Sequence, residues 1–396
     1  MRPPRAKSVD PREVELKLHL PDGSRAVLEA SPLLAGARAK QRHLVTTYFD
    51  TPDRQLDRDG LTLRVRYNGN TYIQTVKTRA TDRGLATDRG EWEWRIDQRV
   101  PELRRLTTTR ALENVAQRIK GNLAPVFVTD IRRTTRLLHF DDNTIVEVAT
   151  DEGNIHTGAA HEPVSELELE LKAGSIGAMY RFAIDLQAHV PFWISPESKP
   201  ARGWHLRTGQ APGIVYARKP ELRNGVRAAA AFRAILSGAL GHLMANIGPT
   251  LRGDAEGLHQ MRLALRRSRA VLDMFEPHLD ADLADGFNTA LRRLGSILGA
   301  ARDWDVFCLE TLPAAIADLP DERLRALKRF GEVKRRIAHV AVADTLRGQD
   351  FTKTVLSLAG WAEDSASQPS TFGDDRMRER LRTIVPSMLD RAANNA

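Results

Sequence analysis

Alternating polar and apolar residues near the start of the chain predict a β-strand. The stretch EVELKLHL at residues 13–20 places acids, a lysine and a histidine on one face and aliphatic residues on the other, because strand side chains alternate between faces. The pattern returns in ELELELK at residues 166–172. Two strands that carry carboxylates on one face and leucines on the other need a common explanation.

One interpretation of these strands is a half-exposed antiparallel sheet, with its leucines in the core and its charges in water. Like charges two residues apart on one face repel, however, unless basic groups lie opposite them. The stretches LRVR at residues 63–66 and TVK at residues 75–77 supply basic groups at strand spacing. This favours the other interpretation, in which the charged faces look at one another.

The same patterning divides the first half into about eight strands with a few helices. Strands are expected at residues 10–20, 43–50, 60–67, 72–78, 89–97, 125–138, 144–151 and 163–172, with helices at 27–38, 110–120 and 175–189 and a basic loop at 198–203. Strands joined mostly by hairpins favour an antiparallel barrel. We expect helices to cover its apolar outer faces and the charged faces to line its interior.

Such an interior would favour a compact polyanion. Seven basic residues are expected there: Lys17, Arg64, Arg66, Lys77, Arg133, Lys199 and Arg202. Arginine forks match phosphate oxygens, and lysine acts as a point charge. The choice of Arg133 over Arg132 is not decided by alternation alone. Carboxylates beside a polyanion need a cation, and Glu13, Glu15, Glu168 and Glu170 are oxygen ligands suited to Mg²⁺ or Mn²⁺.

The first half resembles the CYTH family of triphosphate tunnel metalloenzymes. The matching stretches are EVELK at 13–17, YFDT at 48–51, LRVR at 63–66, TVKT at 75–78, RGEWE at 89–93, TDIRR at 129–133, EVATD at 147–151, ELELELK at 166–172 and SKPARG at 198–203. The resemblance implies that the four glutamates hold a divalent metal and that the seven basic residues bind a triphosphate. It also favours Arg133, and it makes Glu91 and Asp151 further tunnel acids. Glu15, Glu170 and Lys17 are the candidate catalytic residues.

The family covers more than one reaction, so alternatives stay open. Fusion to a helical domain favours inorganic triphosphatase over hydrolysis of an organic triphosphate such as thiamine triphosphate. A competing class is a non-catalytic protein that only holds polyphosphate. Nucleic-acid binding through basic helices is a third possibility, which the 6% content of aromatic residues disfavours.

After residue 222 the alternation gives way to helical periodicity. Helices are expected at 222–247, 254–275, 281–301, 321–347, 350–363 and 374–392. On the second of these, His259, Arg262, Arg266 and Arg269 fall on one face. A stripe of cationic or titratable groups indicates an anion site, although a solvated helix face is the alternative.

The second half resembles the CHAD domain, a helical module associated with polyphosphate binding. The residues that carry this are HQMRLALRRSR at 259–269 and LGAARDWD at 298–305. The family usually has two related halves, each with a histidine-bearing basic helix, and one such helix is evident here. We therefore expect a module that is shortened at its C-terminal end.

Composition agrees with a two-domain protein that binds anions. The 396 residues carry a formal charge of +8 and one cysteine, Cys308, so an internal disulfide is excluded and a cytoplasmic location is the default expectation. No apolar run of about 20 residues and no signal peptide are evident. We expect a tunnel domain at residues 1–205, a linker at 206–222 and a helical domain at 223–396. Oligomeric state is left open.

Overall fold

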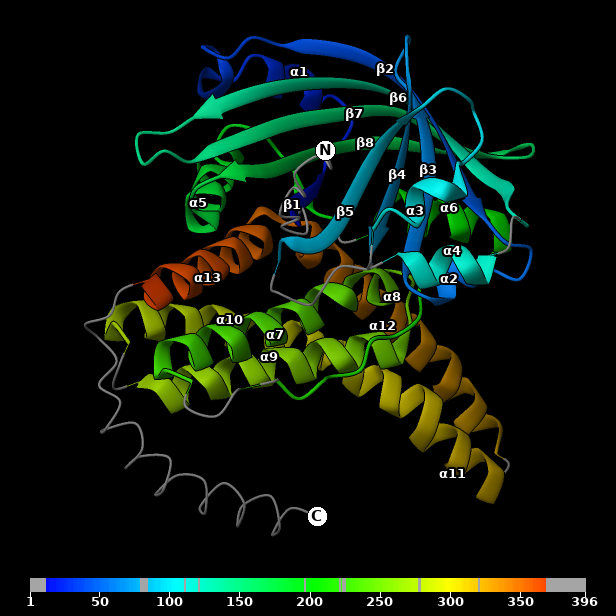
Figure 1. Cartoon of the computed structure of the whole chain (residues 1–396). Helices are drawn as coiled ribbons and strands as arrows, with labels where there is room; N and C mark the ends of the chain where they lie inside the picture. Colours follow the sequence, from blue (N-terminus) through cyan, green and yellow to red (C-terminus); the bar gives the residue numbers. More distant parts are fainter. Residues whose placement is uncertain are drawn as a thin grey trace. The chain divides into compact units, whose positions relative to one another are not determined.

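The computed structural model divides the chain into two compact units. They comprise residues 1–214 with 346–352, and residues 215–345 with 353–396. The structure describes residues 12–78, 85–109, 112–119, 122–195, 197–220, 222, 226–276, 279–319 and 321–367. The expected helix at 374–392 lies outside these residues. Each unit is described by itself (Figure 1).

The first unit is built on a closed barrel of eight antiparallel strands within the described residues. These are β1 Arg12–His19, β2 Lys40–Asp50, β3 Leu61–Tyr67, β4 Tyr72–Thr78, β5 Thr87–Ile96, β6 Ala124–His139, β7 Ile145–Thr157 and β8 Ala160–Ala173. They pair in the order β5-β4-β3-β2-β6-β7-β8-β1, and a pairing of β1 with β5 closes the ring. A two-residue strand, β9 (Trp193–Ile194), adds to the far end of β1. The predicted antiparallel barrel is confirmed.

Short helices lie on the outside of the barrel, as the apolar faces of the strands predict (Figure 1). They are α1 Ser24–Glu29, η1 Pro32–Leu34, α2 Gln55–Arg58, α3 Leu103–Leu106, α4 Glu113–Ile119, α5 Ile176–Gln187 and α6 Lys199–Thr208. Strand residues such as Leu63, Val65 and Val76 form one buried cluster with Leu106 of α3 and Val115 of α4. Apolar side chains therefore pack outward under helices, and the inward positions are left to polar residues.

Two predicted segments differ in the structure. The single helix expected at 27–38 is two short pieces, α1 and η1, because Pro32 begins the second piece and cannot continue the first. The expected basic loop at 198–203 is the start of helix α6. The Ser198 side chain caps this helix by accepting a hydrogen bond from the Ala201 backbone N–H, and Gly209 ends it at φ 70°.

The second unit is helical throughout its described elements, as predicted. The elements are α7 Ala228–Ala245, α8 Ile247–Leu251, α9 Ala255–Phe275, α10 Ala281–Val306, the π-helical segment Phe307–Thr311, α11 Leu312–Asp318, α12 Glu322–Arg347 and α13 Gln349–Ser367. Asp254 and Asp280 cap α9 and α10 with their carboxylates. Buried residues from α7 and α9, among them Phe232 and Met261, supply its core.

One segment of this unit is more apolar than the others. Residues 228–251 are long and apolar enough to cross a membrane by length and composition, although no such run is evident by inspection of the sequence. Within the structure, 61% of the most apolar stretch of this segment is buried. The core helix of a soluble protein passes the same test.

Helix α6 packs closely on strand β6 at Gly203, and a substitution there tests this packing. A side chain at this position would meet the Phe127 ring, whose nearest atom lies 2.5 Å from the ideal Cβ position. We expect Gly203→Ala to destabilise the first unit by about 1–3 kcal/mol through overpacking. Urea unfolding followed by tryptophan fluorescence measures this, since Trp204 is adjacent and packs edge-on against Phe127. Gly213→Ala, which meets nothing within 4 Å, is the matched control, and an equal effect of the two substitutions would contradict the packing argument.

Candidate active site

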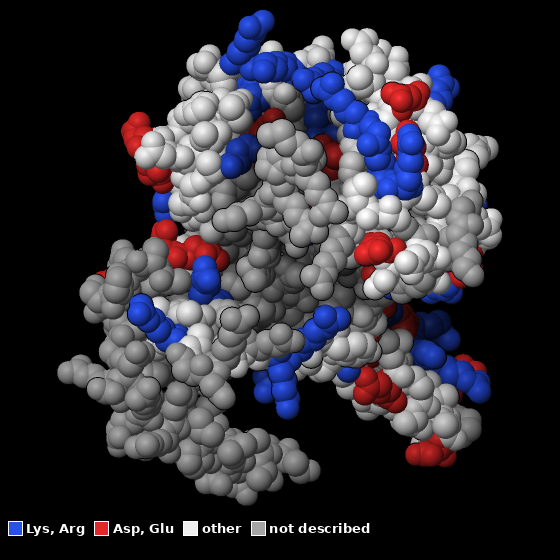
Figure 2. Space-filling model, viewed as in Figure 1, with Lys and Arg blue, Asp and Glu red and all other residues white. Residues whose placement is uncertain are grey.

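A cavity of about 230 Å³ lies inside the barrel and is lined by side chains from all eight strands. Its charged lining consists of Glu13, Glu15, Lys17, Arg64, Arg66, Lys77, Arg89, Glu91, Glu93, Arg133, Glu147, Asp151, Glu168, Glu170, Lys172 and Lys199. Lys and Arg side chains cluster on this unit with acidic side chains visible between them (Figure 2). Because strand residues of one parity all point inward, the charged faces look at one another, as predicted.

Strand register decides which charges meet. Lys17 of β1 lies directly opposite Glu168 of β8, and Lys77 of β4 lies opposite Glu91 of β5. Glu170 of β8 has a different position, because it lies between Glu15 on one neighbouring strand and Glu147 on the other. The barrel therefore combines acid–base pairs with one row of three cross-strand carboxylates.

One group of ion pairs gathers around Glu13 and Glu15 on β1. The Lys77 ammonium donates to both oxygens of Glu13 at 2.8 and 2.7 Å, and it lies 3.0 Å from Glu91. Arg89 reaches Glu13 at 2.8 Å and also contacts Glu15. Burial opposes ionisation of Glu13, but Lys77 and Arg89 outweigh it and hold its pKa well below the usual range.

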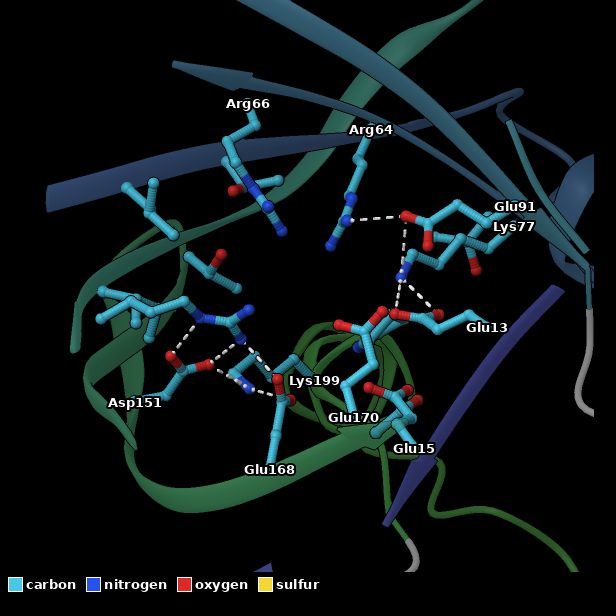
Figure 3. A pocket seen from close by; sticks show the side chains of 18 of the residues that line it. Glu13, Glu15, Arg64, Arg66, Lys77, Glu91, Asp151, Glu168, Glu170 and Lys199 are labelled. Carbon is cyan, nitrogen blue, oxygen red and sulfur yellow. Dashed lines mark hydrogen bonds and ion pairs between the residues drawn. The ribbon is translucent and has the colours of Figure 1, made fainter. Parts of the chain in front are cut away.

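A second group gathers around Asp151 and Glu168. Arg133 donates to Asp151 through two nitrogens, both at 2.6 Å, and lies 2.5 Å from Glu168. The Lys199 ammonium, at the start of α6, lies 2.7 Å from Asp151 and 2.9 Å from Glu168, and it also contacts Glu166. The two groups lie on different sides of the cavity, and Arg64 and Arg66 point into it from a third side (Figure 3).

Two sets of acidic side chains in this region could supply oxygen ligands to a divalent cation. Asp151, Glu166 and Glu168 offer three oxygens within 4.8 Å of one another, but all three contact Lys199, and Arg133, Arg202 and Lys17 supply further positive charge to them. In the row formed by Glu15, Glu170 and Glu147, Glu15 pairs with Lys17 and Arg89, whereas Glu170 and Glu147 share one lysine, Lys172, at 2.6 and 3.6 Å. Burial raises the pKa of Glu170, and although Lys172 opposes the rise, Glu13 and Glu147 add to it. Carboxylates that repel in this way are a suitable donor set for Mg²⁺ or Mn²⁺.

Arg66 is a cation that forms no ion pair with an acidic side chain among the described residues. Its Nε is buried without a hydrogen-bond partner among the described residues. Burial together with the neighbouring Arg64 and Arg133 lowers its pKa to about 10. Arg64 also has a buried Nε that lacks a partner in the described part of the chain, but it pairs with Glu91 at 3.5 Å, and although burial opposes this, Tyr48 and Glu91 raise its pKa. A buried guanidinium without a counter-ion favours binding of an anion.

The structure brings most of the predicted site residues together. All four predicted metal ligands line the cavity, as do Lys17, Arg64, Arg66, Lys77, Arg133, Lys199, Glu91 and Asp151. Arg133 points inward while Arg132 is exposed. Of the two arginines between which alternation could not choose, the inward one is therefore Arg133, as expected. Arg202 does not line the cavity. It pairs instead with Glu162 and Glu166 at 2.6 Å each. It lies three residues, nearly one helical turn, after Lys199 on α6.

Sequence reasoning missed four lining residues, Arg89, Glu93, Glu147 and Lys172. Glu93 and Arg89 have the same parity as Glu91 on β5, and Glu147 has the same parity as Asp151 on β7, so extending each alternation by two or four residues would have found them. Lys172 continues the alternation of β8. The expected excess of basic residues is also corrected, because the lining holds eight basic and eight acidic side chains among the described residues.

The four residues expected to bind polyphosphate lie on α9 of the second unit. Arg262 donates to the Gly299 carbonyl at 3.3 Å and lies 3.8 Å from Asp303. Arg266 is exposed, and His259 and Arg269 are half-buried. The Nε of Arg269 is buried without a hydrogen-bond partner in the region that the structure describes.

Comparison with known proteins identifies both halves of the chain. The CYTH domain matches residues 11–203 and the CHAD domain matches residues 234–396. An inorganic triphosphatase from Haemophilus influenzae is 33% identical over 168 residues, which are 42% of this chain and 47% of that protein. The chain thus spans about half the length of this curated relative.

Two solved structures give matches of limited extent. A putative adenylyl cyclase from Hippeastrum, reported to have a dominant triphosphatase activity, is 20% identical with a TM-score of 0.37 and covers 50% of this chain and 96% of its own. The CHAD domain from the plant Ricinus communis is 29% identical with a TM-score of 0.40 and covers 46% of this chain and 61% of its own.

The environment of Lys77 predicts an unusual titration in the metal-free protein. Burial, with Arg64 and Arg89 nearby, lowers the pKa of Lys77 to about 8 against the opposing effect of Glu13 and Glu15. Lys77 is therefore charged below about pH 8 and neutral above it, whereas an ordinary lysine has a pKa of about 10.4. We expect its ¹³Cε resonance, assigned by its absence in Lys77→Met, to titrate near pH 8. A midpoint above 10 would contradict the desolvated environment.

Proposed function

We propose that this chain, in which residues 11–203 are a CYTH domain and residues 234–396 are a CHAD domain, hydrolyses inorganic triphosphate to diphosphate and phosphate inside the barrel. The observation that carries the proposal is the pair of guanidinium groups, Arg64 and Arg66, that face the cavity with buried Nε atoms lacking hydrogen-bond partners among the described residues, Arg66 also having no ion pair there. The similarity to an inorganic triphosphatase supports it.

Charge balance in the cavity supports a metal complex of the anion as the bound species. The lining is formally neutral, with eight basic and eight acidic residues. A bare polyanion would be repelled by the carboxylates, and a bare cation by the guanidinium groups. A triphosphate whose charge is largely offset by divalent cations satisfies both groups at once.

Glu13, Glu15 and Glu170 are the residues that we assign to a divalent cation, Mg²⁺ or Mn²⁺, with Glu168 completing the predicted set. Such a cation, when bound, would polarise a phosphoryl oxygen. Glu15 and Glu170 contribute to catalysis by holding it, and Lys17 orients Glu15, which it contacts at 2.5 Å, and Glu168.

The basic residues then act on the phosphate chain. Arg64, Arg66 and Lys77 neutralise charge on the terminal phosphoryl group, and Arg133 and Lys199 hold the rest of the chain. Water attacks the terminal phosphorus, the bridging P–O bond breaks, and diphosphate leaves with the bridging oxygen while a proton is released. Arg202 is assigned a supporting role, because it holds Glu166, which in turn contacts Lys199.

The lining supports an inorganic rather than an organic substrate. Among the described lining residues Tyr48 is the one aromatic side chain, and its ring already stacks on Phe127 with centroids 4.5 Å apart. A nucleobase or thiazole ring would find no free aromatic surface in this lining.

A cytoplasmic location, without a membrane or nucleic-acid partner, remains part of the proposal.

Replacing Glu15 and Glu170 by Gln separates the enzyme from a protein that only holds phosphate chains. We expect each substitution to lower the release of phosphate from triphosphate in the presence of Mg²⁺ or Mn²⁺ by ~100-fold or more, because each removes a charge from the cation site. Binding of triphosphate, measured calorimetrically, should persist because Arg64 and Arg66 are unchanged.

Glu152→Gln is the matched control for this experiment. Glu152 lies on β7 and pairs with Arg132 at 3.4 Å outside the cavity. Full activity in the Glu15 and Glu170 variants would exclude this site as the catalytic centre. Absence of activity in the unmodified protein, with binding retained, would favour the non-catalytic alternative.

We assign polyphosphate binding in the second unit to His259, Arg262, Arg266 and Arg269 on α9. Their helical spacing and the unpartnered Nε of Arg269 support this. We expect the double substitution Arg262→Gln and Arg266→Gln to weaken binding of long polyphosphate by ~10-fold or more and to reduce its dependence on salt, because two anion contacts are lost. Arg233→Gln on α7, which removes an exposed arginine paired with Glu363, is the control. Arg233→Gln removes one charge instead of two, so a loss in it of half the logarithmic change or more would point to net charge instead of a site.

A further inference from the structure

Arg89 contacts the carboxylates of both Glu13 and Glu15 on β1. Its Nε lies 2.8 Å from Glu13, and its Nη2 contacts Glu15. The pairing of β1 with β5 places Arg89 directly opposite Glu13, so the strand register holds the contact in place. Its side chain is 13% exposed. A single guanidinium therefore bridges the two glutamates that are separated by one residue on β1.

The lysines near these glutamates do not bridge them in this way. Lys77 contacts Glu13 and Glu91, and Lys17 contacts Glu15 and Glu168. Each lysine thus connects one of the two glutamates to a different strand. Among the contacts given for the described residues, Arg89 is the side chain that touches both glutamates. It occupies the position between two carboxylates where a cation shared by Glu13 and Glu15 would bind.

We propose that Arg89 is an internal counter-ion of Glu13 and Glu15 which a divalent cation displaces when it binds. The inference rests on the proposed function only in assigning those two glutamates to the metal. A guanidinium carries one charge spread over a plane, whereas a divalent cation places two charges at close range on oxygen ligands. The free protein keeps its paired acids stable through Arg89, and this pairing lowers the affinity for metal in the absence of substrate.

Displacement would also couple the metal to the anion. Arg89 lines the same cavity as Arg64 and Arg66. Once it is released from the glutamates, its N–H groups lack acceptors in a desolvated space, where unpaired donors are unfavourable. Phosphate oxygens are the acceptors that the proposed substrate would supply. Metal binding alone is therefore costly for the free protein, and metal binding together with the anion is not.

The test measures binding of Mn²⁺ to the full chain, stripped with EDTA and kept free of phosphate, by titration calorimetry or by the electron paramagnetic resonance of free Mn²⁺. Loss of charge-assisted hydrogen bonds to two carboxylates predicts that Arg89→Gln binds Mn²⁺ ~10-fold or more tightly than the unmodified protein. Unchanged or weaker binding in this variant would overturn the proposal, because it would make Arg89 a support of the site rather than a competitor.

Arg66→Gln is the matched control. It removes another arginine from the same cavity and changes the net charge by the same amount, but Arg66 forms no ion pair with Glu13, Glu15 or another carboxylate among the described residues. A gain in affinity as large as that of Arg89→Gln would show that net charge alone is responsible, and would also overturn the proposal.

A second variant covers the case in which Arg89→Gln does not fold. Arg89→Lys keeps the charge but cannot bridge two carboxylates with a planar fork. We expect it to bind Mn²⁺ more tightly than the unmodified protein does, and an affinity equal to or weaker than that of the unmodified protein contradicts the displacement. These measurements contain no triphosphate, so they stand apart from the hydrolysis assay. Failure to hydrolyse triphosphate would leave the exchange of Arg89 for a cation intact.

Discussion

The structure depends on one electrostatic constraint, which is that a charge inside the closed barrel is costly unless it has a partner there. A charged side chain removed from water is costly unless an opposite charge or hydrogen bonds replace the lost solvent. Strand alternation places charged residues at inward positions of seven of the eight strands, β2 being the exception. Register then decides whether neighbours attract, as Lys17 and Glu168 do, or repel, as Glu147 and Glu170 do. The pairs keep the interior stable without a ligand, and the repelling rows and underpaired guanidinium groups create affinity for one.

The apolar shell makes this arrangement possible. In most barrels the apolar residues fill the interior, but here leucines such as Leu16, Leu18 and Leu169 are fully buried on the outward faces. Helices cover these faces, so hydrophobic burial stabilises the barrel from outside and its interior is free for polar chemistry. Helix α6 links the two regions, because Gly203 packs closely on Phe127 while Lys199, at the start of the same helix, reaches the cavity.

Much of the fold and most of the site could be predicted from the sequence, because both follow from the parity of short strands. Parity placed Glu13, Glu15, Arg64, Arg66 and Lys77 on inward faces. It did not reveal which residues face one another, since the pairing of β1 with β5 that brings Arg89 to Glu13 joins strands far apart in the sequence.

Other errors had local causes. Arg202 was expected in the cavity with the other basic residues, as the family resemblance implies, and helix α6 instead turns that side chain toward Glu162 and Glu166. The row from Glu15 through Glu170 to Glu147 depends on the register across three strands, which alternation within one strand does not contain.

The most direct test of the account is a crystal structure with tripolyphosphate and Mn²⁺, with the metal located by its anomalous scattering. The account predicts an anomalous peak inside the barrel in contact with Glu13, Glu15 or Glu170, and a phosphate chain that extends from it toward Arg64 and Arg66. A phosphate chain bound on the outer surface of the barrel, or Mn²⁺ bound away from these glutamates, would contradict it.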